Sequence, residues 1–241
     1  MQRHRFFASP ARILDSNIYL DPDESHHLTR VLRLMPGASV YVFDGRGAEY
    51  ECEVTRTNKD RTELRILARL SNEVESPLRL ILGQALVKGD KFDWIVQKAT
   101  ELGVSQIIPL LTEHSEFKKA EGREQRLQRW RRIALEATKQ CGRRNLLEIG
   151  DVQDYEQFCA TTNTEVNLIF SERVGQQLIS KSLISSITIT IGPEGGWSER
   201  EIQQAEASGF TPIHLGNRIL RTETAAISAI TLTQFLYGDL R

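Results

Sequence analysis

Residues 187–202, which read ITITIGPEGGWSEREI, decide the fold of this chain. The apolar run 187–191 predicts a buried β-strand, and the glycines after it predict a tight loop. Ser198 and Glu201 have the spacing of a capping box, so a helix is expected to begin here and to end before Gly209. This order is typical of an open α/β sheet, which binds ligands at the carboxyl ends of its strands.

The same rhythm of strands and helices extends over the chain from Leu78 onward. Residues 90–102 and 124–141 predict helices, because each segment places its apolar side chains on one face. Alternating strands and helices predict a largely parallel sheet. The expected strands are 78–85, 106–111, 146–149, 167–170, 187–191 and 212–215.

A smaller β-rich domain is expected over residues 1–72, followed by the α/β domain over residues 73–241. In the first domain, alternating apolar and polar side chains separated by turns predict a small sheet or barrel, with one helix that stops before Pro36. The expected strands are 38–43, 50–54 and 62–67. The polar stretch 71–77 ends in proline and predicts the linker.

The composition is that of an ordinary globular protein. With 40% hydrophobic and 26% charged residues, the 241-residue chain can form a sizeable core without a metal ion. No run approaches the roughly 20 apolar residues of a membrane span, and the N-terminus lacks a secretory signal. We therefore expect a cytoplasmic protein that binds neither a membrane nor a metal. Cys52, Cys141 and Cys159 lack metal-ligand spacing and predict free thiols.

Positive charge is concentrated in residues 118–144. This segment holds ten Lys or Arg and three Glu, a net charge of +7, which leaves −8 for the rest of a chain of net charge −1. Phosphates favour clustered cations through counterion release, so one interpretation is an anionic partner. A solvated helix face is the other interpretation, and the charge alone does not decide between them.

A second polar loop follows the last expected strand. Thr222 or Thr224 can cap a final helix rich in Ala and Ser, with Arg221 and Glu223 on either side of one threonine. Close packing would explain the small residues of that helix, and a tight turn would explain the glycines at 192–196, but neither explains the charged pair. The glycine loop at 192–196 matches neither a Walker A nor a GxGxxG motif, so neither nucleotide-phosphate motif is supported.

These two loops resemble the signature of the 16S ribosomal RNA uridine-N3 methyltransferases of the SPOUT class. The matching residues are IGPEGG at 191–196, LG at 215–216 and LRTETA at 220–225, with further similar blocks at 31–34, 88–91, 97–104 and 140–143. The resemblance therefore covers nearly the whole chain. Two blocks depart from it. Glu113, His114 and Ser115 stand where the family usually has Glu-Arg-Ser. In the family a proline usually follows shortly after the arginine at position 143, whereas this chain continues with RNLL at 144–147.

The resemblance implies a PUA-like, RNA-binding N-terminal barrel and a C-terminal α/β domain tied into a trefoil knot, which periodicity would not predict. It also implies S-adenosylmethionine as the cofactor, 16S ribosomal RNA or the small ribosomal subunit as the partner, and a homodimer with the last helix at its interface. Two alternatives remain open. One is an RNA-binding protein without catalysis, and the other is a related enzyme acting on another RNA, such as a tRNA ribose methyltransferase.

Methylation of uridine N3 requires loss of the N3 proton, after which negative charge spreads over the uracil carbonyl oxygens. Arg221 is the candidate for stabilising that charge, with Glu223 or Glu194 as the base or as the group that orients it. The residues expected to bind the cofactor are Gly192, Pro193, Glu194, Gly195, Gly196, Leu215, Gly216, Asn217, Ile219, Leu220 and Thr222. The residues expected to bind RNA are Arg3, Arg5, Arg12, Arg30, Arg33, Arg129, Arg132 and Arg143.

Overall fold

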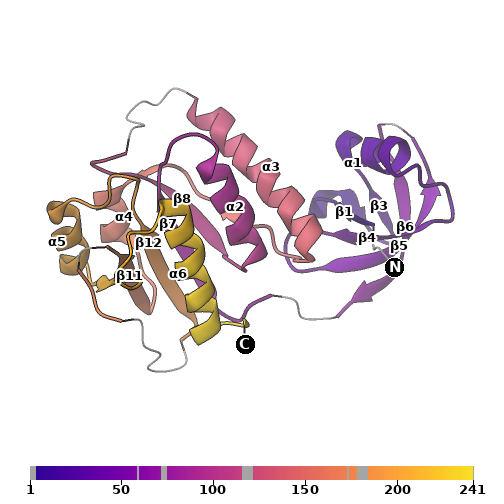
Figure 1. The fold of residues 1–241 in the computed structure, drawn as a ribbon. Coiled ribbons are helices and arrows are strands. Elements are labelled where there is room, and N and C mark those ends of the chain that lie inside the picture. Colours follow the sequence, from indigo (N-terminus) through magenta and orange to yellow (C-terminus); the bar gives the residue numbers. More distant parts are fainter. Residues whose placement is uncertain are drawn as a thin grey trace. The chain divides into compact units, whose positions relative to one another are not determined.

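The contacts of the chain divide it into two compact units. The computed structural model describes residues 4–58, 60–71, 75–115, 122–172, 174–177 and 184–240 (Figure 1). One unit comprises Met1–Glu75 and Thr138–Leu146, and the other comprises Ser76–Ala137 and Leu147–Arg241. The chain therefore returns to the first unit after it has begun the second. The boundary expected between residues 72 and 73 falls on residues 72–74, which lie outside the described residues.

The first unit is built on a mixed sheet, six-stranded within the described residues. In spatial order its strands are β1 (Arg5–Phe7), β4 (Ser39–Phe43), β5 (Glu49–Arg56), β6 (Glu63–Leu70), β3 (Asn17–Tyr19) and β2 (Ile13–Leu14). β1 and β4 are parallel, and the other described neighbours are antiparallel. The alternating pattern predicted β4, β5 and β6, whereas β1, β2 and β3 are too short to produce a clear pattern.

The helix expected before Pro36 is irregular. The side chain of Asp21 caps α1 (Pro22–His26) by accepting from the Glu24 N–H at 2.8 Å, and a π-helical turn, η2 (His27–Val31), follows directly. Arg33 then has φ of 54°, a left-handed conformation more commonly taken by glycine at the end of a helix. Upstream, a 3-10 helix, η1 (Pro10–Arg12), precedes β2.

A largely buried ion-pair network (Arg5, Glu49, Glu75, Arg143 and Arg144) joins the two sequence segments of the first unit. Arg5 pairs with Glu49 at 2.7 Å, and Glu49 also accepts from Arg144 at 3.2 Å. Glu75 accepts from Arg143 at 3.0 Å and from the Arg144 N–H at 2.7 Å. Arg5 further donates to the carbonyl oxygens of Thr138, Lys139 and Arg143, which lie in and just beyond the last turn of α3 (Arg123–Cys141).

The second unit contains a sheet in which all described neighbouring strands are parallel. In spatial order its strands are β10 (Gln153–Asp154), β8 (Gln106–Leu111), β7 (Arg79–Ala85), β12 (Ser186–Ile191), β11 (Val166–Phe170) and β13 (Thr211–Ile213), and β9 (Glu148–Ile149) pairs with β8. The parallel α/β architecture predicted from the sequence is thus confirmed. The last strand ends at Ile213, so Leu215 lies in a loop rather than in the strand expected over 212–215.

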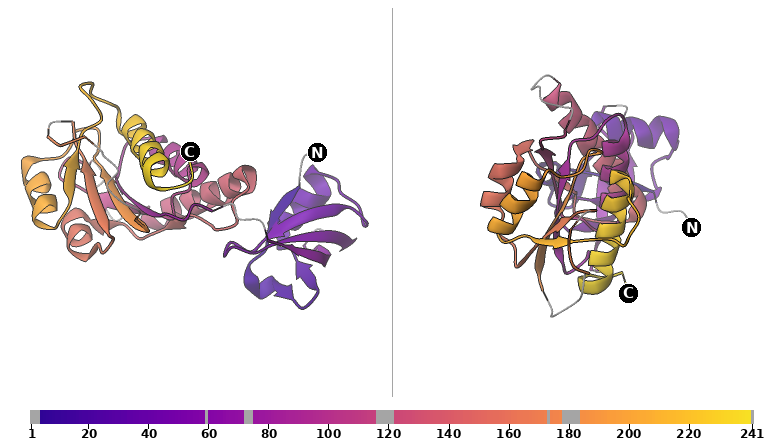
Figure 2. Two further views of the ribbon diagram at one scale, coloured as in Figure 1. Left: turned by 90° about the horizontal axis from the view of Figure 1, so that it is seen from below. Right: turned by 60° about the vertical axis from the view of Figure 1, so that its left-hand side comes forward.

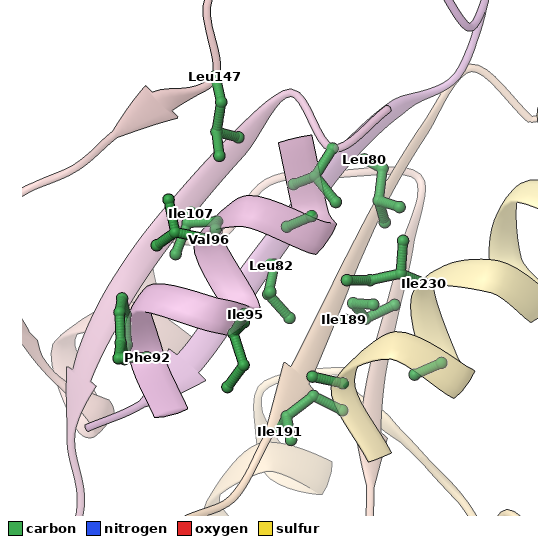
Figure 3. Close-up of a cluster of buried hydrophobic side chains, with 14 of the residues drawn as sticks. Leu80, Leu82, Phe92, Ile95, Val96, Ile107, Leu147, Ile189, Ile191 and Ile230 are labelled. Atoms are coloured by element: carbon green, nitrogen blue, oxygen red, sulfur yellow. The ribbon is translucent and has the colours of Figure 1, made fainter. Parts of the chain in front are cut away.

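Helices cover both faces of this sheet. They are α2 (Lys91–Glu101), α4 (Tyr155–Thr161), α5 (Glu199–Ala207), α6 (Thr222–Tyr237) and part of α3. Ile187, Ile189 and Ile191 of β12 point into one core with residues of α2 and α6, as Figure 3 shows for several of them. A second core contains residues of α4 and α5 together with Ile169 of β11. α6 packs beside α2 on its face of the sheet (Figures 1 and 2).

Candidate active site

Loops at the carboxyl ends of β11, β12 and β13 enclose a cavity of about 480 Å³, within the roughly 300–1,000 Å³ typical of small-molecule sites. All the residues expected to bind the cofactor line it except Asn217. Of the three catalytic candidates, Arg221 and Glu194 line the cavity and Glu223 does not. Because the strands are parallel, their carboxyl ends share one edge of the sheet, which brings these distant sequence segments together.

The glycine loop (residues 192–196) is held tightly between its neighbours. Trp197, only 1% exposed, donates from its indole to the Phe170 carbonyl at 2.9 Å, and a Cβ on Gly192 would lie 3.2 Å from its ring. Gly196 has φ of 71°, and a Cβ there would lie 2.6 Å from the Glu172 carboxylate. Glycine at these positions therefore serves close approach and a left-handed backbone, and α5 begins with the expected capping box of Ser198 and Glu201.

Thr222 connects the glycine loop to the last helix instead of capping that helix, as the sequence had suggested. Its hydroxyl donates to the Gly192 carbonyl at 2.6 Å and accepts from the fully buried Gln84 at 3.3 Å. Arg221 occupies the N-cap position of α6 without a side-chain capping bond. The prediction that Thr222 or Thr224 caps this helix is therefore wrong, because both threonines lie inside the helix and the Thr222 hydroxyl bonds to the glycine loop.

Glu194 is anchored by α2. One of its oxygens accepts from the Lys91 ammonium at 2.7 Å and from the Lys88 N–H at 3.2 Å. Partial burial raises the pKa of Glu194, but the hydrogen bonds from Lys91 and from the backbone N–H groups of Glu194 and Lys88, with the positive charge of Lys91, outweigh it and hold the pKa below its usual range. A carboxylate so stabilised is a poor proton acceptor and a good anchor for the loop.

The remaining catalytic candidates differ in position. Arg221 is exposed on the cavity wall, where its guanidinium is available to a ligand. Glu223, in the first turn of α6, has a buried carboxylate oxygen without a hydrogen-bond partner in the described part of the chain. Its place outside the cavity wall argues against direct contact with a ligand in that cavity.

The arginines expected to bind RNA fall into distinct environments. Arg5 and Arg143 belong to the buried ion-pair network, so neither is available to an RNA phosphate as the sequence suggested. Arg129 pairs with Asp90 and Asp93, and Arg12 is half-buried. The exposed arginines of the set are Arg30, Arg33, Arg129 and Arg132, of which Arg129 forms the ion pairs just named, while Arg3 lies outside the described residues.

The sequence motifs missed several residues of the cavity wall, notably Lys91, Glu172 and Arg218. Glu172 comes two residues after the end of β11, so the rule that ligands bind at carboxyl ends could have identified it. The departure at residues 113–115 also lies beside the site. The His114 ring nitrogen is 3.1 Å from the Gly196 carbonyl, and the Glu113 N–H donates to Glu201 at 2.8 Å.

The fold and cavity define an α/β protein with a ligand site at the carboxyl edge of a parallel sheet, preceded by a β-rich domain. The RNA methyltransferase domain family matches residues 74–234, and the RNA methyltransferase PUA domain family matches residues 20–67. A ribosomal RNA small subunit methyltransferase E of Buchnera aphidicola is 35% identical over 92% of both chains. The protein of that name from Bacillus subtilis is 30% identical over 99% of this chain and 100% of its own.

Two solved structures cover all of this chain and are themselves fully covered. A methyltransferase from Legionella pneumophila with bound S-adenosylmethionine has a TM-score of 0.92 at 32% identity. A ribosomal RNA small subunit methyltransferase E from Neisseria gonorrhoeae, bound to the same molecule, has a TM-score of 0.91 at 35% identity. The chain belongs to the RNA methyltransferase family that contains the ribosomal RNA small subunit methyltransferases E.

Proposed function

We propose that this protein transfers a methyl group from S-adenosylmethionine to N3 of a uridine in 16S ribosomal RNA. The observation that carries the proposal is the cavity at the carboxyl edge of the sheet, which combines the glycine loop with Arg221. Whole-chain similarity to proteins named ribosomal RNA small subunit methyltransferase E, and to two methyltransferase structures with bound S-adenosylmethionine, supports the choice. Within the described ranges, no helix is both long and apolar enough to cross a bilayer. The cytoplasm, where ribosomal RNA is found, is the proposed location.

The cavity suits the proposed cofactor in size and in chemistry. Glycines bring backbone donors and acceptors to its wall, while Leu215, Ile219 and Leu220 provide apolar surface for an adenosine. The bond between Thr222 and the Gly192 carbonyl fixes the spacing of the two loops that would hold it. When bound, S-adenosylmethionine supplies a methyl group activated by a sulfonium.

Arg221 is the proposed catalytic residue. As uridine gives its N3 proton to a water molecule, negative charge develops on the uracil carbonyl oxygens, and the Arg221 guanidinium at the cavity wall stabilises that charge. Glu194 is assigned a positioning role, because Lys91 holds its carboxylate and lowers its pKa. Glu223 lies outside the cavity wall, in the first turn of α6 next to Arg221. We therefore assign it no direct contact with the ligand.

The proposed RNA contacts are made by the exposed Arg30 and Arg33 in the first unit and, separately, by the exposed Arg132 in the second unit. The proposed homodimer interface uses the outer face of α6, where Leu232 and Phe235 are exposed, together with Trp94 of the adjacent α2. Exposed large apolar side chains on neighbouring helices are typical of protein interfaces. The trefoil knot of the second unit remains a prediction.

The test is methylation of ribosomal RNA from a strain that lacks this protein. With S-adenosylmethionine, the purified protein should add one methyl group to small-subunit RNA, and nucleoside mass mapping should place it on N3 of a uracil. Methylation of a ribose oxygen, or of transfer RNA in preference to ribosomal RNA, would contradict the proposal. RNA binding without methyl transfer would identify a non-catalytic protein.

A further inference from the structure

Glu172 is a charged residue of the cavity wall to which the mechanism above gives no role. It follows β11, whose carboxyl end opens into the cavity, and it lies beside Phe170 and Ser171, which line the same wall. Its side chain is exposed, and its carboxylate lies beside Gly196 of the glycine loop.

This carboxylate lies close to Gly196. A Cβ built on Gly196 would lie 2.6 Å from one Glu172 oxygen and 3.5 Å from the other. The absence of a side chain at Gly196, whose φ is 71°, therefore leaves the space that the carboxylate occupies. The glycine loop and Glu172 together form one corner of the cavity.

Glu172 and Glu194 both contribute a carboxylate to the cavity wall. Lys91 pairs with Glu194. A carboxylate has about four acceptor positions on its two oxygens, so Glu172 can accept from a ligand in addition to its contacts within the protein. The two arginines of the wall, Arg218 and Arg221, come from the loop after β13. Glu172 thus places an acceptor-only group in a cavity whose proposed ligand carries ribose hydroxyls and an ammonium group as hydrogen-bond donors.

We infer that Glu172 is a cofactor-binding residue that accepts hydrogen bonds from a donor group of S-adenosylmethionine. The inference rests on the proposed function, because that function supplies the ligand. A carboxylate that accepts from a hydroxyl pair or an ammonium group makes stronger bonds than a neutral acceptor. Glu172 therefore contributes to binding and not to the chemical step.

Calorimetric titration of the full-length protein provides the test. Glu172→Gln keeps the shape and removes the charge, and it should weaken S-adenosylmethionine binding by about tenfold or more, the range expected for losing a hydrogen bond to a charged group. Glu199→Gln is the matched control, because Glu199 is an exposed carboxylate at the start of α5 outside this cavity. It should leave the affinity unchanged, and both variants should melt close to the parent.

Two further ligands identify the donor group. 5′-Methylthioadenosine keeps the ribose but lacks the amino acid part, and S-adenosylhomocysteine keeps the amino acid part but lacks the sulfonium charge. Equal losses for all three ligands would assign the ribose hydroxyls, and losses for all but methylthioadenosine would assign the ammonium group.

Three outcomes would overturn the inference. A loss confined to S-adenosylmethionine would mean that Glu172 senses only the sulfonium charge. Unchanged affinity for every ligand in the Gln variant would exclude a binding role. Unchanged affinity with a collapsed turnover rate would make Glu172 a proton acceptor instead. Failure of the parent protein itself to bind S-adenosylmethionine would contradict the proposed function, so the two failures are distinguishable.

Discussion

The buried ion-pair network of the first unit and the charged wall of the cavity use the same residue types for opposite purposes. In the network, Arg5, Glu49 and Arg144 are each less than 10% exposed, and the Glu49 carboxylate pairs with both arginines. On the cavity wall, Arg221 is exposed, and its charge faces the space where a ligand binds. Buried charges that pair with one another stabilise the fold, whereas an exposed charge on a cavity wall is placed to contact a ligand.

The difference predicts that breaking the network has the largest effect on stability. Glu49→Ala leaves two buried guanidinium groups without their carboxylate, and it should destabilise the first unit by about 3–5 kcal/mol. Glu53→Ala in the same strand is the control. Glu53 pairs with the well exposed Arg65, so its loss should cost about 1 kcal/mol or less.

Thiol labelling during denaturation assigns that loss to one unit. Burial raises the pKa of Cys52 in the first unit to about 12, and burial is also the main cause that raises the pKa of Cys159 in the second unit to about 11. Neither thiol reacts at neutral pH until its unit opens. Glu49→Ala should expose Cys52 at lower denaturant and leave Cys159 unchanged, with the exposed Cys141 replaced by serine. Equal shifts of both thiols would contradict the division of the chain into two units.

On the cavity side of the comparison, Arg221→Ala should leave the melting temperature unchanged and lower kcat by about a hundredfold or more, the scale for loss of one fixed oxyanion donor. The guanidinium meets its charge partner only as the N3 proton leaves, so ground-state binding should change little. Lysine should rescue poorly, since a point charge does not reproduce a planar donor pair. Single-turnover rates at saturating RNA and cofactor provide the measurement. A normal single-turnover rate at saturation with a raised KM would show that Arg221 contributes only to ligand binding.

Glu194 shares features with both kinds of charged residue, because it is paired with Lys91 and also lines the cavity. Glu194→Gln and Lys91→Ala should each raise the cofactor Kd by about tenfold, or about 1.4 kcal/mol, while kcat at saturation is retained. The double variant should be no worse than either single variant if the two side chains act as one anchor. Collapse of kcat with normal affinity in Glu194→Gln would instead identify the base.

The pH dependence of cofactor binding follows from the same pair. Because the pKa of Glu194 is lowered in the folded protein, the anchor is intact above the ordinary carboxyl pKa of about 4.3. It is lost as the pH falls through the lowered value. The cofactor Kd should therefore be insensitive to Glu194 ionisation near neutral pH and rise only under acidic conditions. A change in the cofactor Kd near pH 7 that is absent from Glu194→Gln would contradict the anchoring role of Glu194.

The smallest effect is expected from two exposed arginines of α3, Arg129, which forms ion pairs, and Arg132. Arg132→Glu should raise the RNA KM a few-fold and reduce the slope of log K against log salt by about one. Arg129→Glu should have a smaller effect on the slope, because Asp90 and Asp93 already neutralise Arg129. Equal slopes in the parent and the Arg132 variant would show that this part of α3 is only a solvated face.

Local patterns predicted much of the second unit. The strand expected at 106–111 has the observed bounds of β8, and the glycine loop and the capping box of α5 were visible in the sequence. These features depend on near neighbours, on side-chain period and on backbone freedom, which a sequence displays directly. The residues expected at the cofactor site were found through a resemblance to known enzymes and through the rule that ligands bind where parallel strands end.

Long-range pairing could not be predicted in this way. Arg5 and Arg143 look like surface cations in sequence, because their partners Glu49 and Glu75 are far along the chain. Lys91 and Glu172 reach the cavity only through the order of the strands. The net charge of +7 over residues 118–144 likewise combines exposed side chains with buried ones, and only the fold separates them.

The return of Thr138–Leu146 to the first unit sets a constraint on how the protein is made. Domains generally fold during synthesis as their residues leave the ribosome, N-terminal domain first. Here the first 75 residues emerge with Arg5 and Glu49 but without Arg143 and Arg144, so the ion-pair network is completed only by a stretch that lies past the middle of the chain. A gene cut after residue 75 would therefore encode an unfinished domain. A fragment extended by a short linker to residues 138–146 would restore the missing guanidinium groups.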